Sequence, residues 1–204
     1  MKPDWLVKAD GICSPCKPAR EWDLLEAEYR LYRFLTEVED TLRSPISSEE
    51  ETLLSTLRKL VRKLVINCYA IKNQIPEADS KTGTSVVLLY DELGFPLTIQ
   101  LETNLPGTRS SIHNHGTWGI IAVLQGEQKN TFWQRDRSPE FPDKIEYVGE
   151  RILAPDEIIS FTPEAIHQIE AVGNEPTVTL NLYGETEGNK RFEFDRAQHT
   201  AKRF

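Results

Sequence analysis

The period of the hydrophobic positions changes near residue 80 of the chain. Before this point apolar residues recur at steps of three and four, which is the spacing of amphipathic helices. One helix is predicted over residues 22–42, and Pro45 forbids its continuation. A second helix is predicted from an N-cap at Ser47 or Ser48 to the turn before Pro76.

From residue 82 onward the pattern is typical of β-strands. Short segments rich in Val, Ile, Thr and aromatic residues are separated by turns that contain Pro and Gly. The number and spacing of these segments predict a sandwich or a barrel, and a jelly-roll barrel fits both. The predicted strands cover residues 85–91, 97–102, 111–115, 119–125, 127–134, 144–152, 157–161, 167–172 and 177–183.

The net charge and the hydropathy of the chain argue against nucleic acid and membranes as partners. The formal net charge is −8, and an acidic balance argues against binding to nucleic acid or to anionic lipid. The first eleven residues hold no apolar run long enough for a signal peptide. The most apolar stretch, residues 85–90, is too short to span a bilayer. We therefore expect a cytoplasmic monomer or homodimer with no nucleic-acid or membrane partner.

The cysteines fit a reducing compartment, because the three of them cannot form a disulfide framework. Cys13 and Cys16 have the CxxC spacing of zinc and redox motifs. A structural zinc site needs further ligands, and a thioredoxin-like motif needs a preceding strand, which the pattern does not predict here. We therefore interpret this stretch as an N-terminal segment whose two thiols have no metal-binding or redox role.

The histidines are few and fall at meaningful positions. His113 and His115 are two residues apart on a predicted strand, so both side chains point to the same face. Two imidazoles so placed can bind one cation at about 2.1 Å. His167 stands at the start of a later strand, and an antiparallel neighbour in a closed barrel can bring it opposite the pair.

The residues around the pair resemble the first sequence motif of the cupin superfamily. A glycine, Gly107, precedes His113 by six residues, and another, Gly126, follows His115 by eleven. The second cupin motif is matched in part, with Gly149 and Pro155 correctly spaced. The resemblance implies a mainly β cupin jelly-roll (double-stranded β-helix) barrel with an N-terminal two-helix extension. Residues 1–80 would pack on the barrel and residues 81–204 would form it, within one structural domain.

The acidic ligand of the first cupin motif is absent, since Gly119 or Ile120 occupies its position. Three neutral imidazoles leave the full charge of a divalent metal uncompensated and favour anionic ligands at its open positions. Imidazole suits Fe, Zn, Ni and Cu alike, so the ligand type alone leaves the metal open.

Three segments make the chain similar to the cysteine dioxygenase family of cupins over roughly residues 84–184. Residues 110–115 resemble its SSIHDH segment, residues 123–127 its LLQG turn, and residues 177–183 its strand that ends in SLHLY. The resemblance implies that His113, His115 and His167 bind Fe(II), with Zn, Ni or Cu able to take its place in a purified sample. It also implies that both atoms of O2 are added to the sulfur of a thiol to give a sulfinate.

The same resemblance makes Tyr183 the active-site tyrosine. Thr179 and Asn181 alternate with it on one strand face, where the family carries serine and histidine. The cysteine that crosslinks to the tyrosine in animal members is absent, since Gly119 or Ile120 stands in its place.

The arginine that binds the substrate carboxylate in the family is also missing, because no Lys or Arg occurs between Lys81 and Arg109. Arg109 shares the strand parity of His113 and is a candidate replacement in the substrate pocket, and Arg191 is another. Trp118 is a candidate roof of the pocket, together with Trp133.

These features predict an Fe(II)-dependent dioxygenase whose partners are O2 and a small thiol. One alternative is a cupin dioxygenase of another substrate, such as a β-diketone or a flavonol, because three imidazoles also suit a bidentate enolate. The other alternative is a cupin that binds a metal without catalysis, since a fold does not establish turnover.

Overall fold

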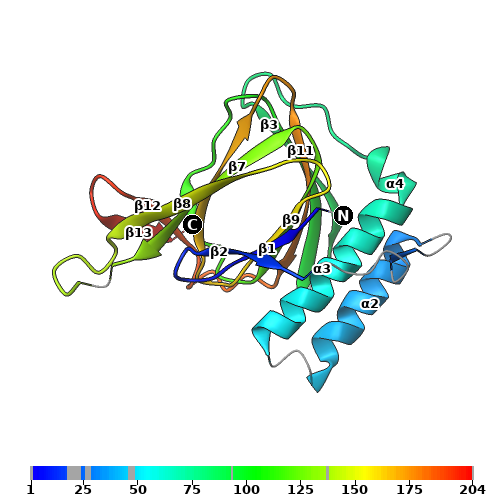
Figure 1. Ribbon diagram of the computed structural model, residues 1–204, viewed down its shortest axis with the longest axis horizontal. Helices are drawn as coiled ribbons and strands as arrows, with labels where there is room; N and C mark the ends of the chain where they lie inside the picture. Colours follow the sequence, from blue (N-terminus) through cyan, green and yellow to red (C-terminus); the bar gives the residue numbers. More distant parts are fainter. Residues whose placement is uncertain are drawn as a thin grey trace.

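A computed structural model describes residues 2–17, 24–25, 29–45, 49–92, 94–136 and 138–203 (Figure 1). Two β-sheets curve around a common interior. One has the strand order β2-β1-β9-β6-β11-β4-β3 and the other β13-β12-β5-β10-β7-β8. The strands are β1 (Asp4–Val7), β2 (Cys13–Cys16), β3 (Thr84–Asp91), β4 (Leu97–Asn104), β5 (Ile112–His113), β6 (Gly119–Gln125), β7 (Glu127–Arg135), β8 (Ile145–Leu153), β9 (Ile158–Phe161), β10 (Ile166–Val172), β11 (Thr177–Gly184), β12 (Phe192–Asp195) and β13 (Thr200–Arg203).

The strand order is that of a jelly roll. The chain crosses between the sheets from β4 to β7, and β8 to β11 then pair back onto those strands. The result is the order β9-β6-β11-β4 in one sheet and β5-β10-β7-β8 in the other. The prediction of a mainly β jelly-roll barrel with two helices before it is confirmed. The predicted strand over 111–115 is shorter in the structure, where β5 holds only Ile112 and His113.

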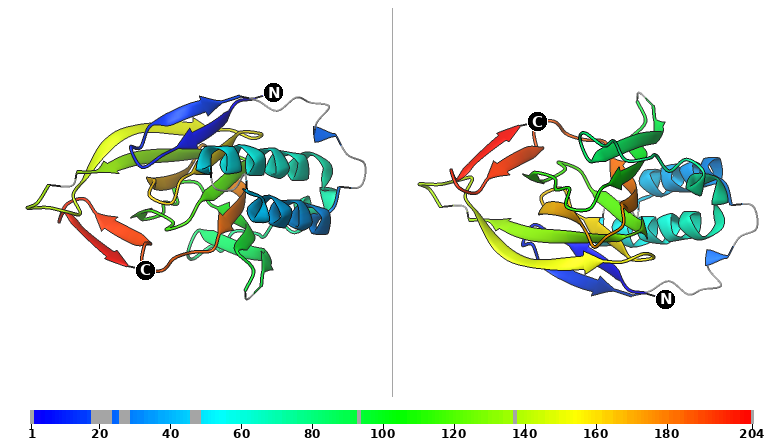
Figure 2. Two further views of the ribbon diagram at one scale, coloured as in Figure 1. Left: turned by 90° about the horizontal axis from the view of Figure 1, so that it is seen from below. Right: turned by 90° about the horizontal axis from the view of Figure 1, so that it is seen from above.

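The helices are α2 (Leu31–Arg43), α3 (Glu50–Asn67) and α4 (Tyr69–Lys72), and they cover one outer face of the barrel (Figures 1 and 2). Their buried side chains share one apolar cluster with the outward-facing residues of β4, β6 and β11. On β4, for example, Ile99 and Leu101 face the helices, because alternate residues of a strand point to opposite faces. The largest apolar cluster of the described residues therefore lies outside the barrel.

The helix boundaries differ from those predicted. Of the helix predicted over residues 22–42, the part from Leu31 onward lies in α2, and Tyr29 and Arg30 precede α2 in non-helical conformation. Residues 22–23 and 26–28 lie outside the described residues. The second begins after Glu49, and the predicted serine N-caps lie outside the described residues. It ends at Asn67, well before Pro76, because Cys68 leaves the helical conformation with φ −101° and ψ 87°.

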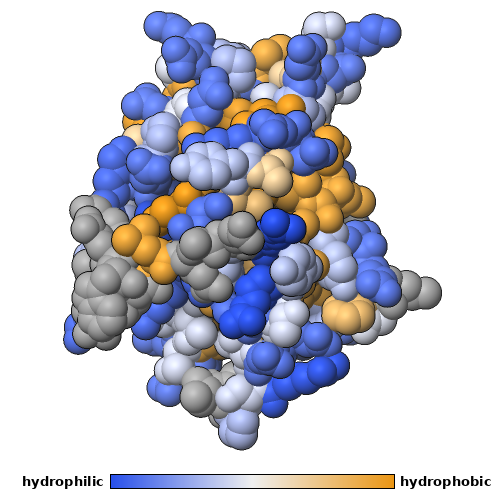
Figure 3. Space-filling model, turned by 90° about the vertical axis from the view of Figure 1, so that its right-hand side faces the viewer, coloured by the Kyte–Doolittle hydropathy of each residue, from blue (hydrophilic) through white to orange (hydrophobic). Residues whose placement is uncertain are grey.

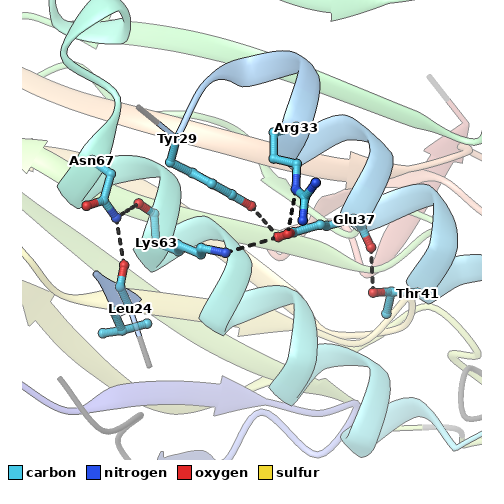
Figure 4. Close-up of polar contacts among 7 residues, drawn as sticks. All are labelled: Leu24, Tyr29, Arg33, Glu37, Thr41, Lys63 and Asn67. Carbon is cyan, nitrogen blue, oxygen red and sulfur yellow. Dashed lines mark hydrogen bonds and ion pairs between the residues drawn. The ribbon is translucent and has the colours of Figure 1, made fainter. Parts of the chain in front are cut away.

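Polar contacts join α2 to α3 around one carboxylate (Figure 4). Glu37 accepts hydrogen bonds from the Tyr29 hydroxyl at 2.6 Å and from Arg33 Nε at 3.0 Å, and it pairs with Lys63 at 3.5 Å. Burial alone would raise the pKa of Glu37, but these donors outweigh it and lower the pKa. At the end of α3, Asn67 Nδ2 donates to the carbonyl oxygens of Leu24 and Lys63, both at 2.7 Å.

The expectation of a purely helical N-terminal region is wrong for residues 4–16. They form a β-hairpin that lies along the barrel wall, with β1 parallel to β9 (Figure 2). All four residues of β1 are buried, so the segment lacks the alternation that marks a strand exposed on one face. The C-terminal hairpin of β12 and β13 was not predicted either, and it extends the second sheet beside β5.

The helix-bearing side of the molecule also holds an apolar groove. Apolar side chains gather on this side (Figure 3), and a groove of about 560 Å³ lies between the start of α2, α4 and β3. Its lining is mainly aromatic and aliphatic, with Tyr29, Tyr32, Tyr69 and Leu89 among its residues.

Among the described residues, no helix is both long and apolar enough to span a bilayer.

Buried arginines attach α3 to the barrel. Arg62 pairs with Asp4 of β1, and both side chains are only 6% exposed. Arg62 Nη1 also donates to the carbonyl oxygen of Asp156 at 2.9 Å, and Arg58 Nη1 donates to Ser160 Oγ at 2.7 Å. A charge buried in this way is tolerated only while its partner remains.

We predict that Asp4→Asn destabilises the protein by about 3–5 kcal/mol, because it leaves the Arg62 guanidinium buried without its countercharge. Urea unfolding followed by circular dichroism measures the change. The control is Lys8→Ala, which breaks the exposed ion pair of Lys8 with Glu51 and should change the stability little. Equal effects of the two substitutions would contradict the prediction.

Candidate metal centre

Two neighbouring strands bring three histidines together. His113 on β5 stands directly opposite His167 on β10, and His115 follows two residues after His113. One ring nitrogen of each histidine lies within 4.8 Å of those of the other two, so the three form a candidate metal-binding group. His167 is almost fully buried and His115 is buried, so this group lies inside the barrel.

Hydrogen bonds to the ring Nδ1 atoms orient two of the imidazoles. His113 Nδ1 lies 3.0 Å from the carbonyl oxygen of Ser111, and His167 Nδ1 lies 3.1 Å from Asn130 Oδ1. Both partners are acceptors, because Asn130 uses its amide nitrogen to donate to Gln128 at 3.0 Å. Nδ1 therefore carries the proton, and Nε2 presents a lone pair.

The donor set fits a bound cation. His115 Nε2 and His167 Nε2 lie 2.9 Å apart, which places two ligand atoms face to face. Two nitrogens that each bind one metal at about 2.1 Å, at a right angle, are about 3 Å apart. A shared cation would thus satisfy both lone pairs, and His113 completes the set.

Burial keeps the cluster neutral. It lowers the pKa of His115 and of His167 well below the ordinary value, and it lowers the pKa of His113 as well. Neighbouring histidines act in the same direction on His115 and His167, because two adjacent imidazolium ions repel each other. The imidazoles are therefore in the form that binds a metal ion.

The histidines open onto a cavity of about 280 Å³ that is lined mostly by residues with polar side chains. Carboxylate, amide, hydroxyl and guanidinium groups share the lining with two isoleucines. The size suits a small molecule rather than a polymer. Besides the histidines, the lining residues are Thr98, Gln100, Glu102, Ser110, Ile121, Ile169, Tyr183, Thr186 and Arg191.

Tyr183 lies beside the histidines, as the sequence predicted. Its ring stacks on that of His115, with the centroids 4.7 Å apart and the planes inclined by 29°. On the other side it faces Gly119, where an added Cβ would come within 3.1 Å of the ring. Burial and the nearby Glu102 carboxylate raise the pKa of Tyr183 well above its usual range, so the hydroxyl stays protonated and can donate.

Thr179 and Asn181 share the inward face of β11 with Tyr183 but lie deeper in the barrel. Both are fully buried, and neither is among the residues that line the cavity. Asn181 Nδ2 donates to Glu102 Oε2 at 3.0 Å, so it contacts the cavity wall indirectly. Their role in a substrate pocket remains a prediction.

Arg109 does not line the cavity. Its guanidinium is largely exposed and donates to Glu170 at 2.7 Å on the outer surface. Arg109 pairs with Glu170 across the strands, whereas His113 pairs with His167, so the register shifts by one residue between them. A shift of one residue exchanges the two faces of a strand, and the argument from parity therefore fails.

Arg191 is the arginine that the structure places in the cavity, where it lines the wall with the histidines. Asn114 holds this segment in place. Asn114 Nδ2 donates to the carbonyl oxygen of Lys190 at 2.8 Å, and Asn114 Oδ1 accepts from the backbone N–H of Phe192 at 2.7 Å. The residue between His113 and His115 thus fixes the backbone on both sides of Arg191.

Trp118 also lies outside the cavity. It lines a separate cleft with residues of α2, and it packs on the apolar cluster under the helices. Gly119 faces Tyr183, so Trp118 points to the opposite side, as does Ile120. Trp133 is buried in a cluster with Ile145 and Ile166 and does not line the cavity either.

The CxxC pair does not gather its two thiols into one site. Cys13 and Cys16 lie on β2 three residues apart, about 10 Å along an extended strand, and on opposite faces. This separation exceeds what a disulfide can bridge. The prediction that no strand precedes the pair is wrong, because β1 does.

No protein-family model and no curated protein matches the sequence. Solved structures with a similar strand arrangement include oxalate oxidase in complex with the substrate analogue glycolate, at 16% identity over 55% of this chain, with a TM-score of 0.43. A cupin superfamily protein from Desulfitobacterium hafniense DCB-2 is 18% identical over 54% of this chain and 84% of that chain, with a TM-score of 0.41. KdgF from Halomonas sp. is 14% identical over 57% of this chain and 94% of its own, with a TM-score of 0.42. The chain spans only 56% of the oxalate oxidase chain.

We predict that Asn130→Leu lowers the affinity for a divalent metal roughly 10–100-fold, because it removes the acceptor that orients His167. Titration of the apoprotein with Zn(II) against a competing chelator measures the affinity. Asn130→Asp keeps an acceptor and should retain most of the affinity. Equal losses in the two variants would show that Asn130 only fills space.

A second prediction concerns the stability of the metal-free protein. The unfolded chain protonates these histidines near pH 6.5, while the folded chain resists protonation. The unfolded state thus binds more protons below this pH, and the free energy of unfolding falls as the pH decreases below about 6.5. The slope is up to about 1.4 kcal/mol per pH unit for each histidine.

Urea unfolding of the chelator-treated protein from pH 7.5 to 5.5 measures this slope. His115→Gln removes one of the titrating groups and should reduce the slope by up to about 1.4 kcal/mol per pH unit. The matched control is His199→Asn, which lies outside the cluster and should leave the slope of the cluster unchanged. An equal slope in wild type and His115→Gln would contradict the prediction.

Proposed function

We propose that this chain is an Fe(II)-dependent dioxygenase that converts a small thiol into a sulfinate. The observation that carries the proposal is the convergence of three neutral imidazoles in a small cavity that also holds Tyr183 and Arg191. His113, His115 and His167 would bind the metal. In the overall reaction a thiolate and O2 combine to a sulfinate, so no further reductant is consumed.

The three ligands leave open coordination positions and a full positive charge. When bound, Fe(II) would supply open positions for a thiolate sulfur and O2 and would mediate the transfer of electrons from the sulfur to O2, since the sulfur provides the four electrons that O2 takes up. The neutral ligand set favours an anionic sulfur at this metal. Zn, Ni and Cu also accept imidazole, so the choice of Fe(II) is part of the proposal.

The residues of the chain would bind and orient the substrate. Arg191, one of the two candidate cations named from the sequence, lines the cavity, and a guanidinium pairs well with a carboxylate. Tyr183 remains protonated and, stacked on His115, lies where its hydroxyl can donate a hydrogen bond to a ligand of the metal. It would position the reacting atoms and hold its proton throughout.

The polar walls favour a small polar substrate over a β-diketone or a flavonol. Thr98, Gln100 and Glu102 line the side of the cavity formed by β4, where an extended apolar or aromatic ligand would have to displace water from polar groups. The remaining alternative is a protein that binds a metal without catalysis, and the experiment below distinguishes it from a dioxygenase.

The test loads the protein with Fe(II) anaerobically and follows O2 uptake with cysteine, cysteamine and 3-mercaptopropionate. We expect uptake with at least one thiol, with the sulfinate identified by mass spectrometry, and none with His113→Ala. Tyr183→Phe should lower kcat by roughly 10–100-fold with metal content unchanged, since a hydrogen bond to a charged group contributes about 1.5–3 kcal/mol. If no thiol supports uptake above the His113→Ala control, the proposed function is wrong.

A further inference from the structure

The wall of the cavity formed by β4, the strand whose outer face packs against the helices, contains one carboxylate that the proposed reaction leaves unused. Thr98, Gln100 and Glu102 alternate on β4 and face the interior, whereas Ile99 and Leu101 face the helices. Glu102 is half-buried and lines the cavity that the histidines share. A charged group in such a place costs solvation energy, so its retention calls for a partner.

Two amides fix the orientation of this carboxylate. Asn104 Nδ2 donates to Glu102 Oε1 at 2.7 Å, and Asn181 Nδ2 donates to Glu102 Oε2 at 3.0 Å. Both donors are neutral, so they hold the group without cancelling its charge. Among the described residues, no Lys, Arg or His forms an ion pair with Glu102.

Two further buried acceptors lie beside Glu102, behind the wall of the cavity. Asn181 Oδ1 and Thr179 Oγ1 are buried and have no hydrogen-bond partner among the described residues. Thr179 stands directly opposite Glu102 across the β4–β11 pair, and Asn181 contacts it through its amide. Neither residue lines the cavity, so the carboxylate of Glu102 is the acceptor of this group that a cavity ligand can reach, and an ammonium group is a donor that matches it.

Glu102 is not a member of the metal-binding group. The ligand atoms that lie within reach of one another belong only to His113, His115 and His167 among the described residues. Each oxygen of Glu102 accepts one hydrogen bond from an amide and keeps a second lone pair. The carboxylate is therefore available to a cavity ligand rather than to the metal.

We propose that Glu102 is the residue that selects the substrate, by accepting a hydrogen bond from a protonated nitrogen of the molecule that fills the cavity. This inference rests on the proposed function for the thiol end of the molecule. Arg191 and Glu102 line the same cavity of about 280 Å³ and carry opposite charges. The substrate class is then a small thiol with an amino group, with Arg191 binding a carboxylate where the molecule carries one.

The test uses two thiols that differ in charge and a metal that does not react with O2. Cysteamine carries an ammonium and no carboxylate, and 3-mercaptopropionate carries a carboxylate and no ammonium. Their binding to the Zn(II)-loaded protein is measured by calorimetry under anaerobic conditions. Glu102→Gln, which keeps the size of the side chain, and Arg191→Met form a matched pair of variants.

Glu102→Gln should weaken cysteamine roughly tenfold or more and leave 3-mercaptopropionate unchanged or tighter, because a hydrogen bond between charged groups is lost. Arg191→Met should do the reverse. If Glu102→Gln affects both thiols equally, or loses zinc when its metal content is measured, the inference is overturned. In the second case Glu102 is a metal ligand.

A pair of ligands without sulfur separates this inference from the proposed function. Ethanolamine and 3-hydroxypropionate differ in charge as the thiols do. If no thiol is oxidised but ethanolamine binds in a manner that depends on Glu102, the dioxygenase proposal fails and the inference stands. If thiols are oxidised and Glu102→Gln leaves the preference between cysteamine and 3-mercaptopropionate unchanged, only the inference fails.

Discussion

The structure depends on the register between two short strands. β5 and β10 place His113 opposite His167, and the antiparallel pairing directs both imidazoles to the interior. Because the side chains of a strand alternate with a period of two, a displacement by one residue would turn one ring outward. Partners outside the cluster protect the arrangement: the Ser111 carbonyl holds one ring and the Asn130 amide holds the other. The cluster is therefore a property of the barrel and not of an isolated motif.

Much of this could be predicted from the sequence, since spacing carries the information. The strand over 119–125 matches β6 at both ends, and the His-x-His pair with His167 forms the cluster that its spacing indicated. The failures have local causes. Arg109 was placed by parity, but the irregular step before β5 exchanges the faces of that segment. β1 was missed because it is too short and too evenly buried to show a strand pattern. Arg191, the other candidate cation, does line the cavity.

One sheet carries apolar residues on its outer face and polar residues on its inner face, and this arrangement explains how a polar interior is tolerated. The outward residues of β4, β6 and β11 meet the helices and form the largest apolar cluster, while the inward residues of the same strands include Glu102, Asn181 and Tyr183. The apolar area that stabilises this half of the molecule is buried outside the barrel. The interior can then hold amides, hydroxyls and charges, provided that they pair with one another or with a ligand.

Asn114 joins two parts of the chain that lie 76 residues apart, since its amide meets the carbonyl of Lys190. All three histidines precede residue 170, whereas Arg191 belongs to the segment that Asn114 fastens. The residues proposed to hold an ion and the residue proposed to bind an anion thus lie in separate parts of the polypeptide. Exchange of the loop between β11 and β12 would alter the choice of ligand and keep the ion-holding strands intact, which makes this loop the natural place for related barrels to diverge in specificity.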